Sequence, residues 1–168
     1  MREMADNDVL YDSTKQSEVK KIMLSMGYSA ESVGKTHHDV YMKPPVLNFE
    51  LHTLLFGAAS DFYAYYQNSK RLMIPDEGSK YGFHFSDEDF YVYMLAHEYK
   101  HFSGGGTGLR SLLDCYVFLQ HKGDTLNWEY IHEQTKQLDI ADFEREQREL
   151  AEKVFSCLLY TSPSPRDV

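Results

Sequence analysis

Three acidic residues in the first third of the chain have the types and spacing of a divalent-metal site. Asp6 and Asp8 stand two positions apart in the strand-like segment 4–11, so both side chains leave the same face. Glu50 lies on the polar face of a second strand-like segment, 46–52. Carboxylates from neighbouring strands supply the oxygen ligands that Mg²⁺ accepts, and a pair of such ions assists phosphoryl transfer. The alternative is a solvated strand edge, because an Asp-x-Asp pair alone is a common pattern.

A second chemical pattern is the run from His97 to His101, HEYKH, which has the HExxH spacing of zinc proteases. On a helix the two histidines share one face, and Glu98 between them has the place of the general base. A third zinc ligand is not evident, because position 107 is Thr107 and the acids Glu129 and Glu133 lie on an acidic helix. The alternative is a pair of pocket-lining or core histidines with hydrogen-bond partners.

The elements that must position the first site form a β-α-β-β unit. After the strand-like start, Ser13 and Gln16 have the spacing of a capping box and predict a helix that ends at Gly27. Two strands, 36–43 and 46–52, are predicted on either side of a proline turn. The apolar stripe of the helix is expected to consist of Val19, Ile22, Met23 and Met26.

The rest of the chain has the pattern of helices, with a capping box and favourably placed acids at Ser86. No linker is long enough to separate independent domains, so an α+β fold is expected, with a small mixed sheet followed by an all-helical half. The expected helices are 60–73, 86–102, 109–121, 127–138 and 141–156, with loops at 75–85 and 103–108.

The glycine-rich turn 103–108 precedes the helix that carries Arg110 and Asp114. Glycines before a helix can admit an anion, or they can form a simple flexible connection between helices. Arg110 and Asp114 stand four positions apart, a spacing that predicts an exposed ion pair. Cys115 has no basic partner nearby in the sequence, which favours a core thiol over a nucleophile.

The overall composition limits the function classes. The chain has 168 residues and a net charge of −9, and this acidic balance disfavours a long nucleic acid as partner. A nucleotide substrate stays open, because a metal ion can supply positive charge. No apolar run is long enough to span a membrane. Two cysteines and the absence of a signal peptide predict a reduced, cytoplasmic location.

Three long segments together resemble a known protein family. The segments are 2–10 with R-x-M-x-D-x-D-x-L, 37–52 with HHDVYMKPPVLNFELH, and 83–119 with its HEYKH and L-R-x-L-x-D motifs. They resemble the bacterial uncharacterised nucleotidyltransferases of the DNA polymerase β-like superfamily. The resemblance implies a truncated polymerase β-like core followed by a helical half, and transfer of an NMP from an NTP to an unidentified acceptor with release of pyrophosphate.

The resemblance also implies which residues act. Asp6, Asp8 and Glu50 match the three carboxylates that bind the metal, two Mg²⁺ ions in the family, and Glu50 is the candidate base toward the acceptor. The residues expected to contact the substrate are Arg2, His97, Lys100, Arg110 and Asp114.

Two departures from the family pattern stand out. Asn7 replaces an apolar residue between the aspartates, and the Gly-Ser turn that holds the triphosphate is missing before Asp6. We therefore expect an inactive fragment as the chain stands. Two alternatives stay open, a zinc-dependent hydrolase that uses His97, Glu98 and His101, and a catalytically inactive binding module.

The expected organisation has three parts. Residues 1–56 form the partial catalytic core, and residues 57–156 form the helical substrate-binding half. The segment 157–168 begins with CLLYTSPSPRD, which resembles the translation of a sequencing adapter. This segment does not continue the helical periodicity of the residues before it, so the expected fold does not include it.

Overall fold

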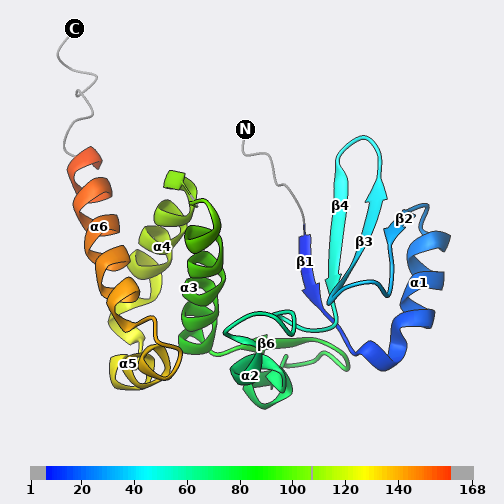
Figure 1. Ribbon diagram of the computed structural model, residues 1–168, viewed down its shortest axis with the longest axis horizontal. Coiled ribbons are helices and arrows are strands. Elements are labelled where there is room, and N and C mark those ends of the chain that lie inside the picture. Colours follow the sequence, from blue (N-terminus) through cyan, green and yellow to red (C-terminus); the bar gives the residue numbers. More distant parts are fainter. Residues whose placement is uncertain (1–6, 107, 160–168) are drawn as a thin grey trace, which may run out of the picture. The chain divides into compact units, whose positions relative to one another are not determined.

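The computed structural model describes residues 7–106 and 108–159, the last three of these for the backbone alone. The chain forms two compact units, Met1–Arg71 and Leu72–Val168 (Figure 1). The first is built on a mixed sheet and the second is mainly helical, so the α+β fold class is confirmed. The functional boundary after residue 56 stays a prediction.

A four-stranded sheet dominates the first unit, with strand order β1-β4-β3-β2. Strand β1 runs parallel to β4, whereas β3 is antiparallel to both of its neighbours. The predicted strands on either side of the proline turn are confirmed as β3 and β4. The strands are β1 (Asn7–Leu10), β2 (Ser29–Ser32), β3 (His38–Lys43) and β4 (Leu47–His52).

One face of this sheet packs against helix α1 (Gln16–Ser25). Because side chains alternate between the faces of a strand, the opposite face of β4 carries the polar residues. The sheet and the helix bury a common cluster, against which Tyr11, Val19, Val33 and Phe49 also pack. The buried members are Met23, Tyr28, Tyr41 and Leu51.

The helix α1 is confirmed, but two details of its prediction are wrong. Its first turn is a 3-10 turn, Ser13–Lys15, capped by Asp12, whose carboxylate accepts from the Thr14 N–H. The side chains of Ile22 and Met26 are more than half exposed. Val19 and Met23, one turn apart, make the contact with the sheet, and the other two lie on the flank of that stripe.

Asp39 on β3 is a buried carboxylate that ties several segments together. It is 1% exposed and faces the hydrophobic side of the sheet. It accepts hydrogen bonds from the Tyr11 hydroxyl at 2.9 Å, from the Gln16 amide and from the Gly34 N–H at 2.7 Å. Burial and the bond to Asp39 raise the pKa of Tyr11. One buried side chain therefore joins the residue that follows β1, helix α1 and the β2–β3 connection.

The segment after β4 differs from the prediction. In place of one helix over 60–73, the chain makes the short helix α2 (Tyr63–Tyr66) and the 3-10 turn η2 (Ser69–Leu72). The reason is a compact aromatic cluster, in which Phe56 lies 5.2 Å from Phe62 and 5.0 Å from Tyr66 between ring centroids. The predicted loop 75–85 is wrong at its end, because β5 (Met73–Pro75) and β6 (Phe83–Phe85) pair as an antiparallel hairpin around residues 76–82.

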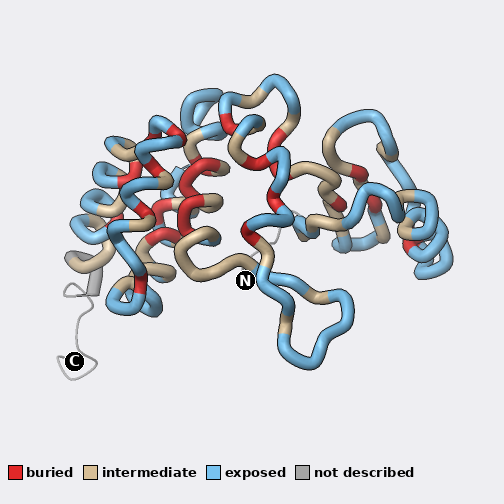
Figure 2. The backbone as a smooth tube through the Cα atoms, turned by 90° about the horizontal axis from the view of Figure 1, so that it is seen from below, coloured by how far each residue is buried: buried red, intermediate tan, exposed pale blue. Residues whose placement is uncertain are grey.

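Two helices of the second unit begin where capping signals predict them. Ser86 accepts from the Asp89 N–H at the start of α3, and Asn127 accepts from the Tyr130 N–H at the start of α5. Buried positions recur along these helices (Figure 2). The helices are α3 (Asp87–Gly104), α4 (Gly108–Lys122), α5 (Trp128–Gln137) and α6 (Ala141–Leu159), with the 3-10 turn η3 (Gly123–Thr125).

The glycine-rich turn ends α3. The N–H of Gly106 donates to the carbonyl of His101, and its φ of 97° lies in the region that favours glycine. Among the described residues, no helix is long and apolar enough to cross a membrane.

The first prediction concerns Asp39. Both carboxylate oxygens of Asp39 accept hydrogen bonds. In Asp39→Asn an NH₂ group, which cannot accept, replaces one of these oxygens and faces the same donors. We therefore expect the free energy of unfolding to fall by about 2 kcal/mol or more. The matched change Glu31→Gln, at an exposed position of β2, is expected to cost less than about 0.5 kcal/mol. Urea unfolding followed by circular dichroism measures both. Equal midpoints for the two variants would show that Asp39 is not the connecting residue.

Candidate functional site

The parallel pairing of β1 with β4 brings two acidic residues side by side. Asp8 stands opposite Glu50 in the register, on the face of the sheet away from the hydrophobic cluster. One carboxylate oxygen of each, with one imidazole nitrogen of His52, lie within 4.8 Å of one another. The side chain of Asp8 is 50% exposed, so solvent reaches the group. We refer to Asp8, Glu50 and His52 as the carboxylate site.

The sequence analysis named Asp6 and Arg2 as further residues of this site. Both lie outside the described residues, so their places in the site stay predictions. Asp8 on β1 and Glu50 on β4 are separated in the sequence by α1, β2 and β3, and the register of β1 with β4 brings them together.

Two histidines beside the carboxylates escaped the sequence analysis as site residues. The Nε2 atom of His52 lies 2.9 Å from Oδ1 of Asp8 and 3.8 Å from Oε2 of Glu50. His38 lies opposite His52 on β3, with its Nε2 atom 3.7 Å from the same Glu50 oxygen. Glu50 and His52 stand two positions apart on β4, so the alternation of the strand alone predicts that their side chains lie on the same face.

These contacts determine what the site can do chemically. Two neighbouring carboxylates disfavour each other's charge, and an imidazolium or a divalent cation between them offsets that repulsion. Oxygen ligands in an open, solvated position suit Mg²⁺, which keeps water molecules and accepts phosphate oxygens in its coordination shell. The residues present therefore fit a hard divalent cation with a phosphate-bearing substrate.

Asn7, the departure from the family pattern between the aspartates, has a structural place. Its side-chain amide donates to the carbonyl of Asn48 on β4 at 3.0 Å. It stands opposite Phe49 in the register and one position away from Asp8, so its side chain leaves the other face of β1. A polar residue at this position thus joins β1 to β4 without entering the carboxylate site.

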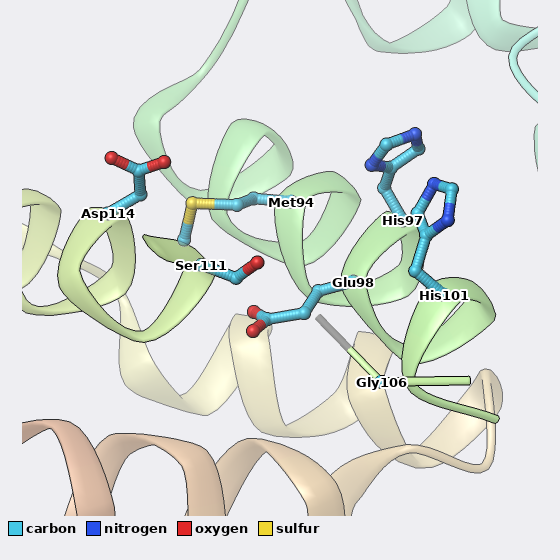
Figure 3. A pocket seen from close by; sticks show the side chains of 7 residues that line it. All are labelled: Met94, His97, Glu98, His101, Gly106, Ser111 and Asp114. Carbon is cyan, nitrogen blue, oxygen red and sulfur yellow. The ribbon is translucent and has the colours of Figure 1, made fainter. Parts of the chain in front are cut away.

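The second unit contains a pocket of about 360 Å³. It contains two of the predicted substrate residues, His97 and Asp114, whereas Lys100 and Arg110 are exposed and do not line it. Figure 3 shows the lining side chains, with the two histidines at one end and Asp114 at the other. The pocket is lined by Met94, His97, Glu98, His101, Gly106, Ser111 and Asp114.

The HEYKH motif lies on α3 as predicted, and its use as a zinc site stays a prediction. The imidazoles of His97 and His101 lie 4.7 Å apart between centroids. The carboxylate of Glu98 extends away from them (Figure 3) and accepts a hydrogen bond from the Gln147 side chain of α6. Among the described residues, no group of three close metal-ligand atoms includes either histidine.

The remaining candidates for that zinc site do not complete it. Glu129 and Glu133 are exposed on α5, and neither belongs to a cluster of potential ligands in the described part of the chain. Thr107 lies outside the described residues. Glu98 is 4% exposed and joins α3 to α6 through its hydrogen bond with the Gln147 side chain, which favours a structural role over that of a general base.

Cys115 on α4 is a core thiol, as its sequence surroundings indicate. Its side chain is fully buried, and burial, with the nearby Glu98 charge, raises the pKa of Cys115 to about 12. A thiol that stays protonated at neutral pH is a poor nucleophile. Beside it, Glu144 accepts hydrogen bonds from Tyr91 and Arg148.

Comparisons with known proteins identify a matching family. A family model described as "Uncharacterised nucleotidyltransferase" matches residues 1–156. The matched range contains the carboxylate site and the pocket of the second unit, and residues 157–168 lie outside it. No curated protein and no solved structure matches the chain.

The second prediction separates a structural from a catalytic role of the HEYKH motif. Removing the carboxylate in Glu98→Ala leaves the Gln147 amide without its acceptor, so we expect the free energy of unfolding to fall by about 2 kcal/mol. His101→Ala, at an exposed position, is expected to cost less than about 0.5 kcal/mol. Urea unfolding, followed by the helical circular dichroism signal, measures both. A stable Glu98→Ala protein, together with a destabilised His101→Ala protein, would contradict the assignment.

Proposed function

The chain belongs to the family of uncharacterised nucleotidyltransferases, and from this premise we propose that it transfers an NMP from an NTP to an acceptor. The family match confirms the resemblance found in the sequence. The observation that carries the proposal is the pairing of Asp8 with Glu50 on the polar face of the sheet.

The carboxylate site has the ligands that this reaction needs. Asp8 and Glu50 would hold Mg²⁺, two ions with Asp6 included, and the imidazole of His52 would fix the orientation of the Asp8 carboxylate. When bound, Mg²⁺ supplies positive charge that stabilises the attacking and leaving oxygens. The two carboxylates alone repel a triphosphate, so nucleotide binding at this face depends on a divalent cation.

The reaction balances without any further reactant. An acceptor oxygen forms a bond to the α-phosphorus, the bond from that phosphorus to the β-phosphate oxygen breaks, and pyrophosphate leaves. Glu50 is the candidate to accept the acceptor's proton, because a carboxylate next to the reacting oxygen can act as a general base. In this proposal the protein contributes mainly position and electrostatic stabilisation.

The second unit is proposed to bind the substrate. Lys100 and Arg110 carry exposed positive charges suited to phosphate, and His97 and Asp114 line the pocket of that unit. Arg2 completes the proposed set from the other end of the chain. A cytoplasmic location, where nucleoside triphosphates are abundant, belongs to the same proposal.

The third prediction tests the carboxylate site directly. In Asp8→Asn and Glu50→Gln the metal loses a charged oxygen ligand, so we expect the affinity for Mn²⁺ with an NTP to fall tenfold or more. Mn²⁺ replaces Mg²⁺ because its electron paramagnetic resonance signal reports binding. The four NTPs are tested in turn, and release of pyrophosphate is followed in the same samples.

The matched control is Glu31→Gln, which makes the same chemical change on β2, at the opposite edge of the sheet from β1. We expect this variant to bind Mn²⁺ and nucleotide as the wild type does. If Asp8→Asn and Glu50→Gln remain folded and bind Mn²⁺ with NTP unchanged, the proposed function is refuted. Binding that is lost in both variants without any pyrophosphate release in the wild type would support the carboxylate site but not the transfer, as expected of an inactive fragment or of the inactive binding module.

A further inference from the structure

Three histidines gather beside the carboxylate site, and only one of them belongs to it. His37, His38 and His52 each offer a ring nitrogen, and these atoms lie within 4.8 Å of one another. The ring of His38 lies 4.8 Å from that of His37 and 5.2 Å from that of His52, between centroids. We refer to these residues as the histidine cluster.

The backbone holds the cluster in place. His38 and His52 are direct cross-strand partners in the β3–β4 register, and their side chains therefore lie on one face. The carbonyl of His37 accepts from the Thr53 N–H at 2.8 Å and from the Thr53 hydroxyl at 3.0 Å. The residue that begins the cluster is thus tied to the residue that follows His52.

A glycine leaves room for the third ring. A Cβ atom at Gly57 would lie 3.1 Å from Nδ1 of His37, which is closer than ordinary packing allows. The ring of His37 therefore rests against bare backbone. This close approach limits the positions that the imidazole can adopt and keeps it near the other two.

Two ring nitrogens of the cluster are buried without hydrogen bonds. The Nδ1 atoms of His38 and His52 are both inaccessible to solvent and make no hydrogen bond. Leaving a buried polar atom unsatisfied costs roughly 1–3 kcal/mol, so such atoms in a folded protein call for an explanation. A metal ion is one partner that satisfies an imidazole lone pair.

The other nitrogen of His52 has the partner that a metal-binding histidine usually has. Its Nε2 atom lies 2.9 Å from the Asp8 carboxylate. A proton on Nε2 would be donated to that carboxylate and would leave the lone pair on Nδ1. Histidines that bind metals commonly donate their second N–H to a carboxylate in this way, which fixes the tautomer and makes the ligand more basic.

We propose that His37, His38 and His52 form a second metal site, which takes a nitrogen-preferring divalent cation such as Zn²⁺. Three imidazoles with an open fourth position suit Zn²⁺, whereas Mg²⁺ prefers oxygen ligands. This site needs no nucleotide, and so it goes beyond the proposed transferase activity. Because His52 contacts Asp8, a bound ion would also hold the His52 ring, and through it the Asp8 carboxylate, in one orientation.

The fourth prediction is that the untagged chain binds one Zn²⁺ ion tightly in buffer without nucleotide. His37→Ala, which removes a ligand that belongs to the histidine cluster alone, is expected to weaken Zn²⁺ binding a hundredfold or more. Competition with a coloured chelator measures the affinity, and circular dichroism verifies that the variant is folded. The other two candidate metal sites, the carboxylate site and the HEYKH motif, are tested by Glu50→Gln and His97→Ala. Both variants are expected to retain the Zn²⁺ ion and to lose far less affinity than His37→Ala does.

A measurement on the wild type covers the case in which His37→Ala does not fold. X-ray absorption at the zinc edge counts imidazole ligands from their outer-shell scattering, and we expect three at about 2.0 Å. Fewer than three imidazoles, or unchanged Zn²⁺ binding in folded His37→Ala, would overturn the proposal. Loss of Zn²⁺ in Glu50→Gln or in His97→Ala would overturn it as well, because the ion would then occupy the carboxylate site or the HEYKH motif. None of these results depends on nucleotide transfer, so the two proposals fail separately.

Discussion

The parallel register between β1 and β4 is the constraint on which the candidate chemistry depends. It sets Asp8 opposite Glu50, although the two residues are far apart in the sequence. A shift of one residue in this pairing would turn every side chain of β1 to the other face of the sheet. The carboxylate of Asp8 would then face α1 and the hydrophobic cluster, where an unpaired charge is strongly disfavoured.

The hydrophobic face of the sheet stabilises the arrangement on the polar face. On one face, Tyr41 and Leu51 are buried against α1, and Asp39 joins the surrounding segments through three donors. On the other face, like charges lie close together, which is unfavourable without a cation or imidazolium between them. The stability of the hydrophobic face therefore offsets the repulsion on the polar face, which is the pattern that strained functional sites in proteins show.

Much of this arrangement could be predicted from local patterns. The alternation of Leu47–His52 and the proline turn before it gave β4 and its polar face, and the caps at Ser86 and Asn127 gave two helix starts. The strand β2 was missed because Ser29–Ser32 has no apolar alternation and forms only by pairing with β3. The histidine cluster was missed for a related reason. His37 and His38 meet His52 only through the β3–β4 register, which a pattern within one segment does not reveal.

The central claim is that Asp8 and Glu50 together bind the catalytic metal, and X-ray diffraction at the manganese absorption edge tests it most directly. Crystals would be grown with Mn²⁺ and an NTP analogue that cannot be cleaved between the α- and β-phosphates. The account predicts an anomalous peak within bonding distance of both carboxylates and of the triphosphate. A nucleotide-bound Mn²⁺ ion that contacts neither Asp8 nor Glu50, for example one held in the pocket of the helical unit, would contradict it.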